Sequence, residues 1–143
     1  MIVTAFRPAH LARLHLQPAQ LAVGAEFLRP GYAEMLQRGG QAFTALDDDG
    51  VIACAGVAEV WEGRGLAWAL IGASAGRHML SVHRAVAGFL KQAPYRRIEA
   101  TVDDGFDEAH RWMRMLGFTL ETPGGMPGFR PDGGRSFLYA KVQ

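Results

Sequence analysis

Hydrophobic and polar positions change their spacing abruptly within residues 98–118. Ile98, Ala100 and Val102 alternate with polar residues, which is the period of a strand with one face toward solvent. An acidic Asp-Asp-Gly turn interrupts the alternation, and acidic side chains suit the positive end of a helix. Apolar residues then recur at helical spacing until Gly117, a typical helix stop. The segment predicts a strand, a short turn and an amphipathic helix.

The first forty residues predict one short strand followed by short helices. Residues 2–6 alternate as a strand, Pro18 can open a helical turn, and Gly39 supplies a stop. Apolar residues at helical spacing mark the helical faces, namely Leu11, Leu14, Leu21, Ala25, Leu28, Tyr32, Met35 and Leu36.

The remainder of the chain predicts hairpins, one long helix and a closing pair of strands. The turn from Asp47 to Gly50 carries an Asp-Gly signal, and a hairpin there accounts for its three carboxylates. Apolar residues on both faces of 66–71 predict a central strand. Strands are expected over 42–46, 51–60, 66–71, 98–102, 119–121 and 136–142, with a helix over 79–90.

The order of these elements is βααβββαβαββ over residues 1–143, with no internal repeat or linker. It predicts a single α/β (α+β) domain in which helices flank a mixed, mostly antiparallel sheet.

The strand and helix over 98–118 resemble the corresponding segment of the GNAT N-acetyltransferases, whose helix carries the pattern N-x-x-A-x-x-x-Y-x-x-x-G-F. Phe106 stands where that family usually has Asn, and Met113 where it usually has Tyr. The element order is also that of the family. The resemblance implies an acyl-CoA-dependent N-acyltransferase, with acetyl-CoA as co-substrate and an amine as acceptor. The matching residues are Ala109, Leu116, Gly117 and Phe118.

The same resemblance assigns a donor site to the end of the central strand and the loop after it. The family's phosphate loop has the form [QR]-x-x-G-x-[GA], and here Gly76 and Arg77 remain while bulkier residues such as Met79 replace the later glycines. A β-carbon limits how closely backbone amides approach a phosphate. An ordinary loop with a solvated arginine is the alternative reading. The resemblance implies donor contacts at Leu70, Ile71, Gly72, Gly76, Arg77, His78 and Met79.

Proton transfer has two candidate bases, Glu59 and Glu62, although an acidic residue beside a turn is also commonly just solvated. Met113 cannot donate a proton, so the departing thiolate would take one from water, Tyr139 or His78. The acceptor would lie under the early helices and the Gly/Pro-rich loop over 122–135, a candidate lid.

A second resemblance is to a phage and prophage branch of GNAT-fold proteins, which includes internal virion proteins of short-tailed phages. It implies the alternative function, a catalytically inactive virion or interaction protein that retains the fold. The residues that carry it are Ala67, Trp68, Ala109, Arg111, Trp112, Leu116, Gly117, Phe118 and Phe137.

Composition narrows the function classes. A net charge of +1 with mixed signs argues against a nucleic-acid footprint, and no segment could span a bilayer. The histidines lack ligand spacing, so no metal site is expected. Cys54 is the only cysteine, and a lone cysteine with no secretory signal predicts a reducing compartment, the cytoplasm, or the virion if phage-encoded.

Some expectations concern packing and assembly. Cys54 lies between alanines in a predicted strand and is interpreted as a small core residue. Trp61, Trp68 and Trp112 are expected to anchor the core. A homodimer and, for a phage protein, virion partners stay open.

Overall fold

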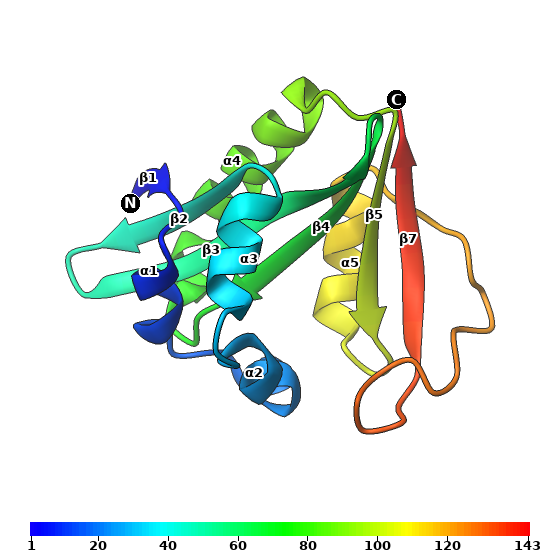
Figure 1. Ribbon diagram of the computed structural model, residues 1–143, viewed down its shortest axis with the longest axis horizontal. Coiled ribbons are helices and arrows are strands. Elements are labelled where there is room, and N and C mark those ends of the chain that lie inside the picture. Colours follow the sequence, from blue (N-terminus) through cyan, green and yellow to red (C-terminus); the bar gives the residue numbers. More distant parts are fainter. The chain divides into compact units, whose positions relative to one another are not determined.

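The computed structural model describes the backbone of residues 1–143 and every side chain except those of Ala22, Val23 and Ala25. Figure 1 labels most of its helices and strands. Its backbone contacts divide the chain into two compact units. The first unit comprises Met1–Ala58 and Trp68–Ala93, and the second unit comprises Glu59–Ala67 and Pro94–Gln143. The single domain expected over residues 1–143 stays a prediction.

Helices and strands follow the expected order closely. The segment counted as two helices after the first strand folds instead as three short helices and a 3-10 turn, because Pro18 and Pro30 interrupt it. In chain order the elements are β1 (Ile2–Ala5), α1 (Pro8–Ala12), η1 (Pro18–Gln20), α2 (Leu21–Phe27), α3 (Tyr32–Gly39), β2 (Ala42–Asp47), β3 (Gly50–Trp61), β4 (Arg64–Ile71), η2 (Ala75–His78), α4 (Met79–Gln92), β5 (Arg97–Asp103), α5 (Asp107–Met115), β6 (Thr119–Leu120) and β7 (Ser136–Val142).

The strands pair in the order β1-β2-β3-β4-β5-β7-β6, so β4 is central, as its two-sided apolarity predicts. β4 and β5 run parallel, with Arg64, Gly65 and Leu66 opposite Arg97, Ile98 and Glu99. The pairs β1–β2, β2–β3, β5–β7 and β6–β7 are antiparallel. The predicted fold class, a mixed and mostly antiparallel sheet flanked by helices, is therefore confirmed.

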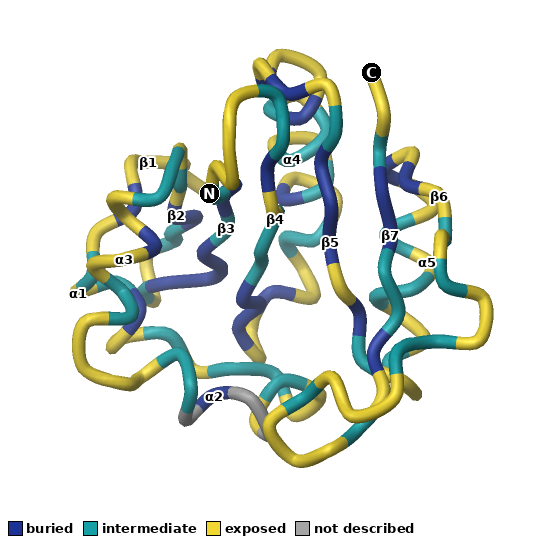
Figure 2. The backbone as a smooth tube through the Cα atoms, turned by 45° about the vertical axis from the view of Figure 1, so that its right-hand side comes forward, coloured by how far each residue is buried: buried dark blue, intermediate teal, exposed yellow. Residues whose placement is uncertain are grey.

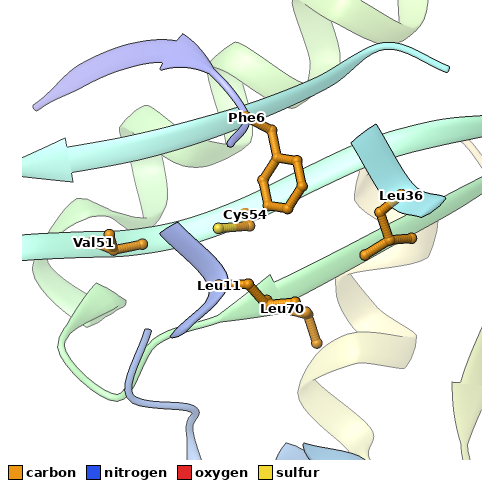
Figure 3. Close-up of a cluster of buried hydrophobic side chains, with 6 residues drawn as sticks. All are labelled: Phe6, Leu11, Leu36, Val51, Cys54 and Leu70. Atoms are coloured by element: carbon orange, nitrogen blue, oxygen red, sulfur yellow. The ribbon is translucent and has the colours of Figure 1, made fainter. Parts of the chain in front are cut away.

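The first unit is built around a buried apolar cluster. Figure 3 shows its members between α1, α3 and the strands β3 and β4. Trp68 packs partly buried against this cluster, its ring edge-on to Phe6 at 5.5 Å. Each such side chain contributes roughly 1.5–3 kcal/mol on burial. The cluster consists of Phe6, Leu11, Leu36, Val51, Cys54 and Leu70.

Cys54 is fully buried, which confirms its interpretation as a core residue. Burial raises the pKa of its thiol to about 11, although a hydrogen bond with Thr44 works the other way. The thiol is therefore uncharged at neutral pH and unreactive as a nucleophile.

The second unit places α5 against β5 and β7, whose central stretches are buried (Figure 2). Gly117 has a φ of +88°, the left-handed conformation that a helix-terminating glycine adopts. Its N–H donates to Arg114 O and that of Phe118 to Met113 O, which closes the end of the helix. Phe118 is buried, so the helix stop read from the sequence is confirmed.

One expectation about packing, that Trp61 anchors the core, is wrong. Trp61 is 61% exposed at the end of β3, where the Arg64 guanidinium lies 4.7 Å from the centre of its ring. Leu21 and Leu28 of the helical segment are also exposed, and the side chain of Ala25 lies outside the described residues. Trp68 and Trp112 are partly buried.

Among the described residues, every helix is too short or too polar to cross a membrane.

Candidate functional site

The residues implied as thioester contacts form the carboxyl end of β4. Leu70 and Ile71 are buried, and the N–H of Gly72 donates to Ile52 O of β3 at 2.8 Å. A β-carbon on Gly72 would lie 2.6 Å from that same oxygen, so this position requires glycine. One edge of the strand end is therefore occupied by β3.

The opposite edge of the strand end pairs with the segment that follows α1. The N–H of Gln17 donates to Ile71 O at 2.9 Å, and the N–H of Ala73 donates to His15 O at 2.8 Å. These two bonds form a short antiparallel bridge that places Leu16 opposite Gly72.

The Gln20 side chain continues this pairing toward the start of β4. Its Nε2 donates to Ala69 O at 2.9 Å, and its Oε1 accepts the N–H of Ile71 at 2.8 Å. Pro18 opens the turn η1 there, which takes the backbone away from the strand. The edge of β4 at residues 69 and 71 therefore binds a carboxamide through one acceptor and one donor.

The loop after β4 leads into the long helix α4. Ala75 is buried and its N–H donates to Gly72 O, whereas Gly76 and Arg77 are exposed. A β-carbon on Gly76 would meet no atom within 4 Å, so packing does not require glycine there. The amides at the start of such a turn have no partners within the helix and favour anions.

Arg77, which the resemblance assigns to phosphate, makes contacts with the turn between β2 and β3. Its guanidinium, 63% exposed, donates to Asp47 Oδ2 at 3.1 Å and to Asp49 Oδ2 at 3.0 Å. His78 Nε2 lies 2.9 Å from the same Asp47 oxygen. The backbone N–H of Asp49, together with Arg77 and His78, lowers the pKa of Asp47 to about 2 although burial opposes this. These four side chains form one hydrogen-bonded cluster.

This cluster was not predicted from the sequence. The hairpin turn is as predicted, with Asp47 Oδ1 accepting the N–H groups of Asp49 and Gly50. The second oxygen of that carboxylate is the one that meets Arg77. The only sign of this cluster in the sequence is a run of aspartates in one loop and an Arg-His pair about thirty residues further along the chain. The carboxylates of Asp47 and Asp49 therefore bind the Arg77 guanidinium, which the resemblance assigns to a phosphate.

The candidate bases Glu59 and Glu62 both lie in the second unit and are exposed. Glu59 is near the end of β3, and Glu62 is in the turn before β4. The implied donor contacts, from Leu70 to Met79, all belong to the first unit. The roles of Glu59 and Glu62 as bases stay predictions.

Tyr139, one of the suggested proton donors, is fully buried and paired with a histidine. Its hydroxyl lies 2.7 Å from His110 Nδ1, and His110 Nε2 lies 3.2 Å from the carbonyl oxygen of Asp103. A carbonyl only accepts, so Nε2 carries a hydrogen, and in the tautomer that has its one hydrogen there Nδ1 accepts from Tyr139. The hydroxyl of Tyr139 is therefore hydrogen-bonded within the second unit.

Comparison with known proteins gives likeness in structure alone. No family model and no curated protein matches the chain. The structure of Ard1 from Thermoplasma volcanium superposes with a TM-score of 0.72 at 13% identity, covering 99% of this chain and 96% of that one.

Two structures of acetyltransferases are similarly close. A GNAT-family acetyltransferase from Bacillus cereus gives a TM-score of 0.71 at 12% identity, over 99% of this chain and 96% of that one. The aminoglycoside 6'-N-acetyltransferase from Enterococcus faecium gives 0.69 at 16% identity, over 99% and 97%. At these identities the likeness shows the fold, which is of GNAT type.

Proposed function

We propose that the chain is an acyl-CoA-dependent N-acyltransferase that uses acetyl-CoA to acetylate an amine. One observation carries the proposal: the edge of β4 at Ala69 and Ile71 binds a carboxamide, directly before the Gly72 turn into the loop and α4. Acyl-CoA reaches its thioester through a pantetheine arm with two amides, which present the same donor and acceptor. The GNAT-type fold supports the proposal, with residues 1–143 acting as one acyltransferase domain.

Each part of the donor meets groups of matching chemistry in this proposal. A pantetheine amide pairs with Ala69 O and Ile71 N, and the thioester lies at the backbone of residues 70–72. The pyrophosphate lies against residues 76–79, at the start of the turn η2, and takes the charge of Arg77. The N–H of Met79 already donates to Gly76 O, so the exposed amide of Gly76 is the one offered to the phosphate. This phosphate loop is degenerate, because Met79 and its neighbours carry β-carbons where glycine would let the backbone come closer.

The proposed reaction is direct attack by the amine on the thioester. The amine nitrogen bonds to the acyl carbon, the carbon–sulfur bond breaks, and one amine proton passes to Glu59 or Glu62 directly or through water. The thiolate is protonated by water or His78, since the Tyr139 hydroxyl is buried and hydrogen-bonded to His110. The acceptor is an amine of unassigned structure.

One observation favours a second candidate, a catalytically inactive phage or prophage virion protein that keeps the fold for interaction. Asp47 and Asp49 lie beside Arg77, so two carboxylates stand next to the place proposed for phosphate. Like charges in such a site oppose anion binding. Capsid and tail genes beside the coding gene would support this candidate.

Replacing Arg77 by Glu is expected to weaken acetyl-CoA binding. The unaltered protein should bind in the micromolar range, about −7 to −8 kcal/mol. Arg77→Glu reverses a charge that contacts phosphate, and because Asp47 and Asp49 share that charge we expect about a tenfold loss. Isothermal titration calorimetry with acetyl-CoA measures both values.

Arg84→Glu is the matched control, because Arg84 is exposed on α4, the helix that follows the loop of Arg77, and undergoes the same charge change. Its affinity should stay within about twofold of the unaltered protein. Absence of heat at millimolar acetyl-CoA would exclude the enzyme. Equal affinities for the Arg77 and Arg84 variants would show that the phosphates lie elsewhere.

A further inference from the structure

The carboxamide that marks the proposed donor site belongs to the chain itself. Gln20 Oε1 accepts the N–H of Ile71, and a backbone N–H directed at one acceptor has no second bond to give. A ligand amide cannot therefore pair with Ile71 while Gln20 does. The two occupants exclude one another.

We propose that Gln20 is an internal competitor for the acyl donor, and that donor binding requires its side chain to leave the edge of β4. This inference rests on the proposed function and adds to it a residue that sets donor affinity. Gln20 is a chemical mimic of the ligand, since its carboxamide offers one carbonyl acceptor and one N–H donor, as a pantetheine amide does.

The structure allows this exchange through one side chain. The bridge formed by His15 and Gln17 uses Ile71 O and Ala73 N, which are different groups from those that bind Gln20. Rotation of the Gln20 side chain would free Ala69 O and Ile71 N while this bridge persists. Gln17 Nε2 donates to Gln20 Oε1 at 3.2 Å and so stabilises the Gln20 side chain in its place on the edge of β4.

While Gln20 is bound to the edge of β4, the donor cannot bind there. The apparent affinity for the donor is therefore the intrinsic affinity multiplied by the fraction of molecules in which Gln20 has left the strand. When Gln20 leaves, Ala69 O and Ile71 N–H each lose a hydrogen bond, and only a ligand with both a donor and an acceptor replaces the two bonds. A ligand without an amide would leave Ile71 N–H unpaired, and an unpaired buried donor is unfavourable. The competitor therefore selects for amide-bearing donors over short thioesters.

Gln20→Ala should bind acetyl-CoA about tenfold more tightly than the unaltered protein, as measured by calorimetry. Gln20→Met, which keeps the length of the side chain without its polar groups, should show the same gain. Gln92→Ala is the matched control, because it removes an exposed glutamine at the end of α4 in the same unit.

Hydrogen exchange of the Ile71 amide gives a readout independent of ligand affinity. The amide should be protected in the unaltered protein, exchange at least tenfold faster in both Gln20 variants, and regain protection with acetyl-CoA. Thermal melts identify a variant that has not folded, in which case the other Gln20 variant decides.

The outcomes separate this inference from the proposed function. Equal acetyl-CoA affinities for the unaltered protein and the Gln20 variants, with binding still weakened by Arg77→Glu, would overturn the competitor and leave the acyltransferase standing. Unchanged exchange at Ile71 in both Gln20 variants would also overturn it. Failure of every variant to bind millimolar acetyl-CoA would remove the proposed function and the inference together.

Discussion

Gly40→Ala is expected to destabilise the protein more than any other change proposed for it. Gly40 follows the last residue of α3, and a β-carbon there would overlap the carbonyl oxygen of Val57 and lie 3.4 Å from Cα of Ala58. Both neighbours are backbone atoms near the end of β3, so the clash cannot be relieved by rotating a side chain. We expect a loss of about 3 kcal/mol or more in the free energy of unfolding.

Urea unfolding at pH 7 measures this loss, and Gly88→Ala provides the matched control. Gly88 is exposed in α4, and a β-carbon there would meet nothing within 4 Å. Alanine favours a helix interior by about 0.5–1 kcal/mol over glycine, so this control should gain stability. Equal effects of the two substitutions would show that α3 does not approach β3 as closely as described.

Glu99→Gln is expected to have the second largest effect, because it removes the charge at the centre of an ion-pair chain. The Glu99 side chain is 7% exposed and binds Arg64 Nε at 2.8 Å and Arg97 Nε at 3.0 Å. Arg97 also binds Glu121, so opposite charges alternate from Arg64 to Glu121. The parallel register of β4 and β5 places Arg64 beside Arg97, and Glu99 separates their charges.

The expected loss for Glu99→Gln is about 2 kcal/mol. Breaking a buried pair costs about 3–5 kcal/mol, and an exposed pair contributes about 0–1 kcal/mol. This site lies between the two, since the carboxylate is buried while Arg64 and Arg97 are each 31% exposed to screening water. Glu62→Gln, an exposed carboxylate of the same unit, is the control and should change stability by less than about 0.5 kcal/mol.

The effect of Glu99→Gln should depend on pH. Burial opposes the charge of Glu99, but hydrogen bonds from Arg64 and Arg97 outweigh it, so its pKa lies below the ordinary value. A lowered folded-state pKa stabilises the protein fully above the unfolded pKa near about 4.3, and this stability is lost as pH falls through the folded pKa. The gap between variant and unaltered protein should therefore shrink from pH 7 to pH 3. A gap independent of pH would assign it to packing.

Local signals in the sequence predicted most of the fold. The strands expected over 42–46 and 136–142 are observed at Ala42–Asp47 and Ser136–Val142. The helix stop at Gly117 has the positive φ that its position requires. These features depend on neighbours in the chain, either through the period of apolar residues or through backbone conformation. Such information is present in any short window of the sequence.

Polar contacts between distant segments were not predicted. Arg77 meets Asp47 across thirty positions, and Gln20 meets Ala69 across forty-nine. A hydrogen bond from a side chain to the backbone produces no periodicity and no motif in the sequence. The contact of Gln20 with β4 therefore could not be predicted, because the sequence shows only a polar residue near the start of a helix. Trp61 was misplaced for a related reason, since its exposure depends on which neighbours the fold supplies.

Backbone amide chemical shifts recorded during titration with acetyl-CoA show whether the end of β4 and the loop after it bind an acyl-CoA. We expect the largest changes at Ile71, Gly72 and residues 76–79, saturating at micromolar ligand. Unchanged shifts at these amides with millimolar acetyl-CoA, or changes confined to other segments, would contradict it.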